Sequence, residues 1–492
     1  MRAPAPVAPA ASRFENSQSL YQQLASRIAG LIQHGTLRPG ERVPSVRRCS
    51  EQQNVSVSTV MEAYRLLEDR GLIEARPQSG YYVRRQRWTP PPEPATSKPQ
   101  ARATDVEISD VMMQVIKGAR DPALVRLGAT LPAAEVFPLK ELNRTMSAVA
   151  RRRPIAAHTY EPPPGNAALR IQIARRAIEA GCSLSPDDII TTVGATEALN
   201  LSLRAVARPG DVIAIESPSF FGILHIIQSL GMRVCEIPTH PRDGICLEEL
   251  EKRLKCCRIK ACVFALNYSN PLGSCMPDEK KAQLVQMLSG RRIPLIEDDI
   301  YGNLTFGINR PKAAKAYDKD GWVLLCDSFT KTLSPGARVG YVAPGRFGKK
   351  IEFLKYVNTS ATASLPQMAI AEFLLNGGYD HHLRKMRRFF STQMQLMSEA
   401  VSRYFPAGTK ATRPDGGMCL WVELPEKVSA LKLYDRALAA GIGIAPGPLF
   451  SAKQRFQNFI RLNCGNPWSD AIEQAIRTVG QIAGEMTDRS RQ

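Results

Sequence analysis

The chain contains 492 residues, of which 44% are hydrophobic and 23% are charged, and its formal net charge is +19. This length exceeds what one ordinary core supports, so two or three globular units are expected. No apolar run approaches the roughly 20 residues of a transmembrane helix, and the Pro- and Ala-rich start lacks the continuous apolar core of a signal peptide.

These exclusions predict a cytoplasmic protein without membrane contact, in which residues 1–13 form a disordered leader. The eleven cysteines agree with a reducing compartment, because only Cys256 and Cys257 are adjacent and none forms a C-x-x-C motif. No metal site is expected. The positive charge suggests an anionic partner, but residues 14–87 carry 11 Arg and 7 acidic residues, so only +4 of the total lies there.

The first predicted elements are three helices followed by a hairpin. Helical spacing of apolar residues predicts a first helix over residues 20–34, which Gly35 ends, and a third helix over 54–71. Between them, Ser45 stands where a short second helix would begin. Residues 72–84 read as two short strands around a Pro-Gln-Ser-Gly tip. The third helix should turn four residues toward the core: Val60, Ala63, Tyr64 and Leu67.

Two helices joined by a tight turn and followed by a wing are typical of a protein that presents one helix to the major groove of DNA. Hydroxyl groups at the start of the third helix can contact bases or phosphates, and arginines near the second helix can bind phosphate. The pattern alone leaves open a protein-interaction module. The candidate DNA contacts are Arg42, Ser45, Arg47, Ser56, Ser58, Thr59 and Gly80.

Residues 17–84 resemble the GntR winged-helix family from end to end. The resemblance rests on L-x-P-G-x-x-x-P-S-x-R, V-S-x-x-T-V-x-x-A-Y and G-L-I…S-G-Y-Y-V. It implies that residues 14–85 form a DNA-binding domain in which Arg47 contacts the phosphate backbone or a base. Val57 and Met61 stand where some relatives carry arginines, so the operator sequence does not follow from the resemblance.

A proline-rich segment comes next. Four prolines between Pro90 and Pro94 favour extended polyproline conformation, so residues 86–108 are predicted to form a semi-rigid linker. Residues 109–492 then alternate short apolar strands with helical stretches, which predicts an α/β domain with a mostly parallel sheet. The expected strands cover residues 188–193, 212–217, 233–238, 261–266, 293–298 and 322–328.

The most informative stretch of the large domain is DSFTKTLSPGARVGY, residues 327–341. A lysine just past a strand, here Lys331, suits Schiff-base chemistry, because burial lowers the pKa of its amine and makes it nucleophilic. Ser328 and Arg338 beside it could hold a phosphate. A lone lysine is usually solvated surface, so other segments must support this interpretation.

Further segments supply complementary groups, mostly at strand ends. Residues 191–203 form a strand-to-helix turn whose free N–H groups can bind an anion, and an aspartate facing a pyridine nitrogen would keep that nitrogen protonated. A phenylalanine ring can stack on a heteroaromatic ring, and an arginine fork can bind a carboxylate. The residues in these positions are Ala195, Thr196, Phe220, Asn270, Asp298, Tyr301 and Arg461.

Residues 120–480 resemble the fold-type I aminotransferases in Y-x-x-x-x-G (from Tyr160), G-A-T-E-A-L, N-P-x-G, D-x-x-Y, S-F-T-K…R-V-G-Y and R-L-N. The resemblance implies a large sheet domain, a smaller α+β C-terminal part and a pyridoxal phosphate cofactor. It also implies that Lys331 forms the internal aldimine, that Asp298 pairs with the pyridinium and that Phe220, in place of a common tyrosine, stacks on the ring. Asn270 and Tyr301 would contact the ring oxygen. The implied phosphate ligands are Ala195, Thr196, Ser328 and Arg338, with Tyr160 reaching over from a second subunit.

The combination of a GntR reader, a proline-rich linker and an aminotransferase-like body resembles the MocR subfamily of regulators. It implies a homodimeric transcription regulator that senses an amino acid or amine through the aldimine and has at most weak aminotransferase activity. A working aminotransferase with an accessory DNA-binding domain remains the alternative. A cofactor-free dimer scaffold is disfavoured, since a scaffold has no need of a coherent site.

Overall fold

A computed structural model describes residues 19–33, 36–37, 40–76, 79–84, 89–107, 110–118 and 121–488. The chain divides into two units, Met1–Thr89 and Pro90–Gln492. Several predictions fall outside the described residues: the leader at 1–13, the helix end at Gly35, the tip residues Pro77 and Gln78, and linker residues 86–88 and 108.

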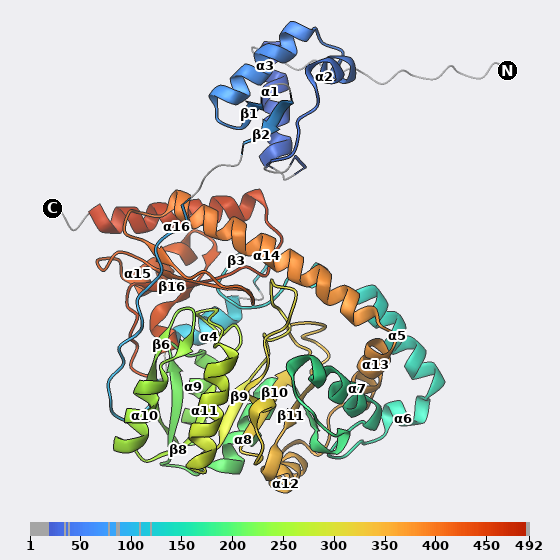
Figure 1. Ribbon diagram of the computed structural model, residues 1–492, viewed down its shortest axis with the longest axis vertical. Helices are drawn as coiled ribbons and strands as arrows, with labels where there is room; N and C mark the ends of the chain where they lie inside the picture. Colours follow the sequence, from blue (N-terminus) through green and yellow to red (C-terminus); the bar gives the residue numbers. More distant parts are fainter. Residues whose placement is uncertain are drawn as a thin grey trace. The chain divides into compact units, whose positions relative to one another are not determined.

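Unit 1 has the predicted winged helix-turn-helix architecture (Figure 1). The Ser45 side chain caps the second helix, as predicted, by accepting a hydrogen bond from Arg48 N. The four residues expected to face inward from the third helix are buried in the core of the unit. Its elements are α1 (Leu20–Gln33), α2 (Val46–Gln53), α3 (Val57–Asp69) and the antiparallel strands β1 (Ile73–Arg76) and β2 (Gly80–Val83).

Unit 2 is built on a large mixed sheet whose eight strands, among the described residues, follow the order β4-β11-β10-β9-β8-β5-β6-β7. Only β11 and β7 run antiparallel to their neighbours. All six predicted strands are present in this sheet. The bounds are β4 (Ile190–Thr192), β5 (Val212–Ser217), β6 (Arg233–His240), β7 (Gly244–Ile245), β8 (Ile259–Phe264), β9 (Leu295–Asp298), β10 (Val323–Ser328) and β11 (Gly340–Ala343).

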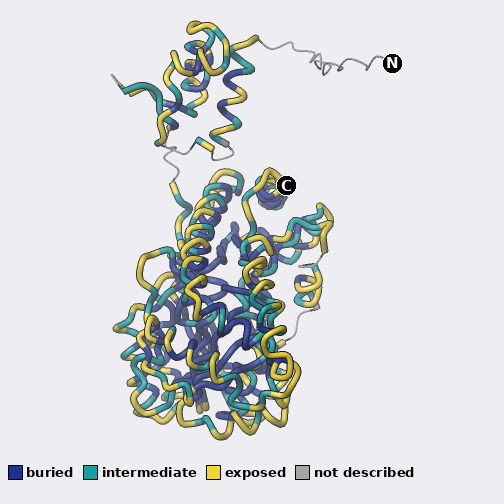
Figure 2. Tube along the Cα trace, turned by 90° about the vertical axis from the view of Figure 1, so that its right-hand side faces the viewer, coloured by how far each residue is buried: buried dark blue, intermediate teal, exposed yellow. Residues whose placement is uncertain are grey.

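Helices cover both faces of this sheet because its strands are apolar on both sides. Ile213 and Ile215 pack with α8, α9 and α12, whereas the intervening Ala214 packs with α10 and α11. The buried residues accordingly concentrate in the middle of the unit (Figure 2). The helix bounds are α8 (Ala195–Val206), α9 (Phe221–Ser229), α10 (Leu247–Cys256), α11 (Asp278–Gly290) and α12 (Gly348–Thr359).

The expected smaller α+β portion of unit 2 is built from its C-terminal residues together with α4 and β3 from the start of the unit. Within the described residues its main sheet has the order β12-β13-β16-β15, and β3 pairs with β14 in a separate short sheet. Its strands are β3 (Val125–Arg126), β12 (Lys410–Ala411), β13 (Cys419–Glu423), β14 (Ile442–Gly443), β15 (Ala445–Pro446) and β16 (Phe459–Asn463). The helices packed on them are α4 (Asp110–Gly118), α14 (Gly378–Tyr404), α15 (Ala430–Ala439) and α16 (Asp470–Asp488).

A group of helices flanks the sheet beside β4 and β11, where α13 packs against α5, α6 and α7. The group comprises α5 (Leu139–Arg152), α6 (Pro154–His158), α7 (Ala167–Ala177) and α13 (Ser364–Leu375). Short 3-10 turns complete the unit: η1 (Ala134–Val136), η2 (Ile178–Ala180), η3 (Pro186–Asp188), η4 (Ala314–Tyr317), η5 (Gly345–Phe347) and η6 (Gly447–Phe450). None of the helices in the described ranges has the length and apolar character needed to cross a membrane.

The proline-rich segment is extended, as its composition predicts, but it does not stand clear of the body. Residues 90–107 belong to unit 2, and Figure 1 shows them as the blue trace that runs past α10. Thr104 pairs with Val234 on the edge of β6. Proline content predicts an extended backbone but carries no information about what that backbone binds.

Candidate functional site

The predicted site residues converge because the strands that carry them are parallel. β4, β5, β8, β9 and β10 point the same way, so their carboxyl ends share one edge of the sheet. Asp298 ends β9, Ser328 ends β10 and Lys331 follows three residues later. Asn270 and Phe220 follow β8 and β5. The strand-end pattern therefore locates most of the site.

Lys331 lies at the centre of this edge. Its Nζ donates a hydrogen bond to the carbonyl oxygen of Thr130 at 2.5 Å. Burial lowers the pKa of Lys331 to about 8, and the positive charge of Arg461 adds to this effect. Asp298 acts in the opposite direction without cancelling the shift. The amine is therefore neutral in a larger fraction of molecules near neutral pH than an exposed lysine would be.

Asp298 is a buried carboxylate that remains ionised at neutral pH. Burial raises its pKa to about 6, while a hydrogen bond from Ile300 N and the charge of Lys331 hold the value down. The Ile300 N to Asp298 Oδ1 distance is 3.4 Å. A carboxylate with this pKa can pair with a cationic group at pH 7 and loses its charge as the pH falls through about 6.

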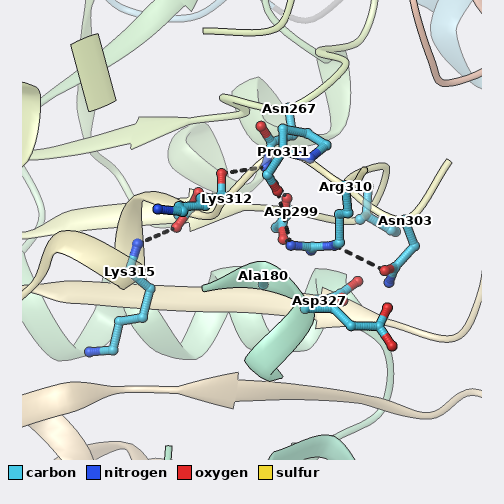
Figure 3. Close-up of polar contacts among 12 residues, drawn as sticks. Ala180, Asn267, Asp299, Asn303, Arg310, Pro311, Lys312, Lys315 and Asp327 are labelled. Atoms are coloured by element: carbon cyan, nitrogen blue, oxygen red, sulfur yellow. Dashed lines mark hydrogen bonds and ion pairs between the residues drawn. The ribbon is translucent and has the colours of Figure 1, made fainter. Parts of the chain in front are cut away.

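The two acidic neighbours of Asp298 have partners of their own. Glu297 accepts hydrogen bonds from Ala314 N at 2.7 Å and Lys315 N at 3.0 Å. Asp299 pairs with the guanidinium of Arg310, which also donates to Asn303 at 2.9 Å (Figure 3). Both neighbours are thus held by partners outside the site edge. Sequence reasoning missed this network, since its members come from separate loops.

Arg461, on β16, is fully buried. Its Nη1 donates to Asn270 Oδ1 at 2.9 Å and its Nη2 donates to the carbonyl of Gly128. The guanidinium carbon lies 4.9 Å from the ring centroid of Phe450. Arg461 Nε has no hydrogen-bond partner among the described residues. An arginine with this arrangement can bind a planar anion, because hydrogen bonds to an anion are stronger than its present ones to the neutral oxygens of Asn270 and Gly128.

Tyr301 and Asn270 lie beside Arg461. The side chains of Asn270 and Tyr301 hydrogen-bond to each other, and burial holds the pKa of Tyr301 well above its usual value, so its hydroxyl keeps its proton. Asn270 Nδ2 also lies 3.5 Å from Thr130 Oγ1. The phenol and the amide together provide hydrogen-bond donors next to Lys331.

The predicted phosphate ligands gather at a corner where β4, β10 and β11 meet. Ser328 and Thr192 both pair with Gly340, so the chain from Thr192 to Gly194 passes close to Ser328. A Cβ on Gly340 would lie 2.7 Å from the carbonyl carbon of Gly194, so only glycine permits this approach. Gly194, with φ of 81°, then caps α8. The N-terminus of α8, which presents Ala195 and Thr196, is an electropositive helix end.

Arg338 completes this corner. Its Nη2 donates to the carbonyl of Val193 at 3.0 Å, and a Cβ on Gly194 would lie 2.8 Å from that nitrogen. Arg338 has a φ of 53°, a left-handed conformation that is uncommon for arginine. The guanidinium is exposed beside the helix end, so both can act on one bound phosphate.

Phe220 and Tyr160, both predicted to contact the cofactor, lie in different surroundings. Phe220 stands at the N-cap of α9, with its ring centroid 4.7 Å from that of Phe221, so a flat side chain lies at the end of β5. Tyr160 is 87% exposed in the described chain, and the structure does not bring it to Lys331. Its predicted role from a second subunit remains a prediction.

The structure adds residues that the sequence reasoning did not identify. The carbonyl of Thr130 accepts a hydrogen bond from Lys331, and the carbonyl of Gly128 accepts one from Arg461. Any residue type could supply such a carbonyl. Buried Cys419 contacts Thr130 Oγ1 at 3.9 Å. Phe450, in η6, lies under the guanidinium of Arg461. It is far along the chain from Gly128 and Asn270, which also contact Arg461. No local motif marks these positions.

The candidate DNA-contact face lies on unit 1. Ser56 caps α3 by accepting from Thr59 N at 3.1 Å, and its Oγ lies 2.8 Å from that of Ser58. The exposed residues of the set include Arg42, Arg47 and Ser58. Gly80, with φ of 102°, begins β2, and a Cβ at this position would lie 3.3 Å from the Arg42 guanidinium, so the glycine leaves room for that group. Ser45 and Ser56 are thus occupied as helix caps, and the other hydroxyls and arginines lie nearby.

Comparison with known protein families matches both units. Residues 136–479 match the family model of aminotransferase class I and II, and residues 20–83 match that of the bacterial regulatory proteins of the gntR family. The eight-stranded mixed sheet lies within the first range, and the winged helix-turn-helix lies within the second.

Individual relatives match between 76% and 94% of this chain. The HTH-type transcriptional regulator YdcR of Escherichia coli is 41% identical to this chain, and the match covers 94% of this chain and 99% of YdcR. The 2-aminoadipate transaminase of Thermus thermophilus is 30% identical, over 76% of this chain and 93% of its own. The crystal structure of LysN, an alpha-aminoadipate aminotransferase from Thermus thermophilus complexed with N-(5'-phosphopyridoxyl)-L-leucine, is 28% identical, has a TM-score of 0.71 and matches 77% of this chain and 96% of its own.

Proposed function

Since the chain belongs to the aminotransferase class I and II family and carries a gntR-family regulatory domain, we propose that this GntR-type regulator binds pyridoxal phosphate in unit 2 and responds to a carboxylate-bearing amine. The observation that carries the proposal is the arrangement of Lys331, Asp298 and the corner at Arg338 along one sheet edge. A reactive amine, a buried carboxylate and an anion site are the three groups that this cofactor requires.

The residues present fit that cofactor. When bound, pyridoxal phosphate supplies an aldehyde that condenses with primary amines and a ring that withdraws electrons. Lys331 has the lowered pKa that condensation with an aldehyde needs. Asp298 stays ionised at neutral pH and can hold a pyridine nitrogen in its protonated form. Gly194 and Gly340 let the backbone and the Arg338 guanidinium pack closely at the helix end, where a Cβ on either glycine would clash.

Each remaining residue has a separate binding role. Phe220 offers a ring face for stacking, and the neutral phenol of Tyr301 with the Asn270 amide can hydrogen-bond a ring oxygen. A phosphate would be held by the following groups: the N-terminus of α8 at Ala195 and Thr196, Ser328, and Arg338.

Arg461 defines the class of the effector. Its guanidinium is buried, has an unpaired Nε among the described residues and donates to neutral oxygens of Asn270 and Gly128. A carboxylate forms stronger, bidentate hydrogen bonds with arginine than neutral oxygens do. An effector with an amine and a carboxylate would suit this site. Its amine would react with the aldehyde of pyridoxal phosphate near Lys331, and its carboxylate would bind Arg461. The ligand in the LysN structure contains such an amino acid portion, leucine.

Two further parts of the proposal concern partners. We propose that unit 1 binds operator DNA through α3 and the wing, supported by the exposed Arg47 and Ser58. We also propose a homodimer, because α12 exposes three large hydrophobic side chains on one face. These are Phe353, Tyr356 and Val357. All eleven cysteines are free, which agrees with a reducing cytoplasm.

Turnover as an aminotransferase is the second candidate function. The completeness of the site favours it, as does the similarity to the Thermus 2-aminoadipate transaminase. The two candidates differ in what the effector changes. A regulator changes its DNA affinity on binding the amine, whereas an enzyme releases a keto acid.

The test is the visible absorption spectrum of the full chain with pyridoxal phosphate, compared with that of Lys331→Ala. The wild type should develop a visible band that the variant lacks, and one amino acid should shift both this band and the DNA affinity. A wild type that stays colourless contradicts the proposed cofactor. Rapid keto acid formation without any change in DNA affinity would favour the enzyme.

A further inference from the structure

Residues 90–107, hereafter the strap, are bound to unit 2 at three places. Near its start, Arg413 Nη2 donates to the carbonyl of Pro91 at 3.0 Å, and Ala411 N donates to the carbonyl of Pro92 at 2.9 Å. Glu93 forms an ion pair with Arg242 at 2.6 Å. The first described residues after unit 1 are therefore already fastened to unit 2.

The central anchor combines a partly buried serine of the strap with a buried arginine of unit 2. Ser97 Oγ donates to the carbonyl of Ser217 at 2.5 Å and accepts from Thr239 N at 3.0 Å. Arg253 donates to the carbonyls of Gln100 at 2.5 Å and Pro99 at 3.2 Å. Ser97 thus joins the strap to two neighbouring strands of the large sheet.

Among the described residues Arg253 has the two strap carbonyls and, more weakly, Cys235 Sγ at 4.0 Å as hydrogen-bond acceptors. The residue is 3% exposed, and no ion pair to it is found among the described residues. A buried guanidinium needs hydrogen-bond acceptors, and the strap carbonyls supply them. Detachment of the strap would remove these two acceptors and uncover the guanidinium, which is 3% exposed only while the strap is bound. The arginine is therefore a specific binding element for the strap, in contrast to a solvated surface charge.

The last anchor closes an open strand edge. Thr104 N donates to Val234 O at 2.8 Å and Val234 N donates to Thr104 O at 2.9 Å, so the strap pairs with β6. Gln228 donates to the carbonyl of Val106 at 3.0 Å, and Glu107 N donates to the carbonyl of Ala452 at 3.0 Å. Unpaired strand edges attract other chains, so this pairing also protects β6.

The anchors set the number of residues between unit 1 and the first attachment of the chain to unit 2. From Arg84, at the end of the wing, to Pro90 there are six residue steps, which span at most about 21 Å. If residues 86–108 were all unbound, as composition predicts, a polyproline-like chain of that length would span about 70 Å. Docking of the strap therefore shortens the available tether roughly threefold.

We propose that the strap sets the reach of the DNA-binding unit: the tether is short while residues 90–107 stay bound to unit 2 and long when they detach. A short tether restricts the spacing and orientation of the half-sites that two readers of a dimer can occupy together, whereas a long tether relaxes both. As a selector of operator geometry the strap rests on the homodimer and the DNA binding proposed above, whereas its attachment to unit 2 is seen in the hydrogen bonds of this chain.

The test measures strap docking and tether length on the full chain without cofactor or DNA, so its outcome is independent of the proposed ligand. Hydrogen–deuterium exchange should show slow exchange at the amides of Ser97, Thr104 and Glu107 in the wild type. In the double variant Ser97→Ala/Arg253→Met, exchange across residues 90–107 should rise at least tenfold. Small-angle X-ray scattering should then give a maximum dimension larger by tens of ångströms.

Lys252→Met is the matched control, because Lys252 neighbours Arg253 on α10 and pairs with Glu249. It should leave both measurements unchanged. Thr104→Pro is a second test that spares the core of unit 2, since it only removes the N–H that pairs with Val234. The proposal is overturned if the wild-type strap exchanges at the rate of a free peptide. It is equally overturned if strap exchange accelerates in both test variants while the maximum dimension stays constant.

Discussion

Lys331 Nζ donates a hydrogen bond to the carbonyl oxygen of Thr130, a residue 201 positions earlier in the chain. The amine at the centre of the site is therefore held by the first part of unit 2. Burial lowers the pKa of this amine to about 8.

The rate of pyridoxal phosphate uptake should depend on pH through Lys331. Only the neutral amine attacks an aldehyde, and a pKa of about 8 leaves roughly a tenth of it neutral at pH 7. We expect the second-order rate constant to rise about tenfold between pH 7 and pH 9 and then to level off. Stopped-flow absorbance at subsaturating cofactor measures it. Lys427→Ala, at an exposed lysine, should match the wild type, and a rate still climbing above pH 10 would contradict the lowered pKa.

Asp298→Asn should weaken cofactor binding at neutral pH by at least about tenfold, because a neutral amide cannot pair with a protonated pyridine. The wild type should lose affinity as the pH falls. The pKa of Asp298 is raised to about 6, so the ionised form dominates above that value and is lost below it. Equilibrium dialysis between pH 5 and pH 8 measures both effects. Asp187→Asn, at an exposed acid, is the control, and equal affinities at pH 5 and pH 8 would argue against the role.

Arg310→Met should destabilise unit 2 by about 3–5 kcal/mol, since it leaves Asp299 buried without its cation. The double variant Asp299→Leu/Arg310→Met removes both charges and should recover a large part of this loss. Urea unfolding of each variant gives the comparison. Arg65→Met breaks the exposed pair with Glu62 and should cost less than about 1 kcal/mol. Additive losses in the double variant would mean that the pair is not coupled.

Arg47→Ala should lower the affinity of the full chain for DNA and reduce the slope of log affinity against log salt by about one. Arg47 is exposed at the start of α2, where a guanidinium can bind phosphate. The probe is a duplex selected by the wild type from a random pool, and fluorescence anisotropy between 50 and 200 mM salt, roughly the range over which such contacts weaken, provides the measurement. Arg291→Ala removes one charge from unit 2 and should change neither quantity.

Tyr356→Glu should dissociate the proposed homodimer, because it places a charge in the apolar face of α12. Sedimentation equilibrium should show a mass near that of one chain for the variant and near twice that for the wild type. Ile178→Glu introduces the same charge at another exposed apolar residue and serves as the control. A wild type that sediments as a single chain would refute the dimer.

The sequence predicts well those features that depend on neighbouring residues, namely the strands and the side chains at their ends. Alternating apolar runs located all six expected strands of the large sheet, and strand-end placement located Asp298, Ser328 and Lys331. The carbonyls of Gly128 and Thr130 could not be predicted, because a backbone acceptor leaves no mark on residue type. The partner of Asp299 was also out of reach, since nothing in the pattern around Arg310 indicates where its loop returns.

The proline-rich linker is a second case in which the sequence predicts local conformation but not long-range contacts. Its prolines correctly predict an extended backbone, and extension is a local property of each residue. Docking depends on Arg253 and Ser217, which lie more than a hundred positions away. Composition alone cannot distinguish an extended segment in solvent from an extended segment on a surface.

The path of the chain from the strap to the site has a consequence for how such a fusion can work. After Glu107 the chain continues through α4 and β3 and then directly supplies Gly128 and Thr130, the carbonyl partners of Arg461 and Lys331. A gntR-family domain joined at this end of the fold is continuous in sequence with the backbone that holds Lys331 and Arg461. A reader joined after α16 would have no such connection. Because the gntR-family domain comes first, one continuous polypeptide segment joins it to the carbonyls that hold these two basic side chains.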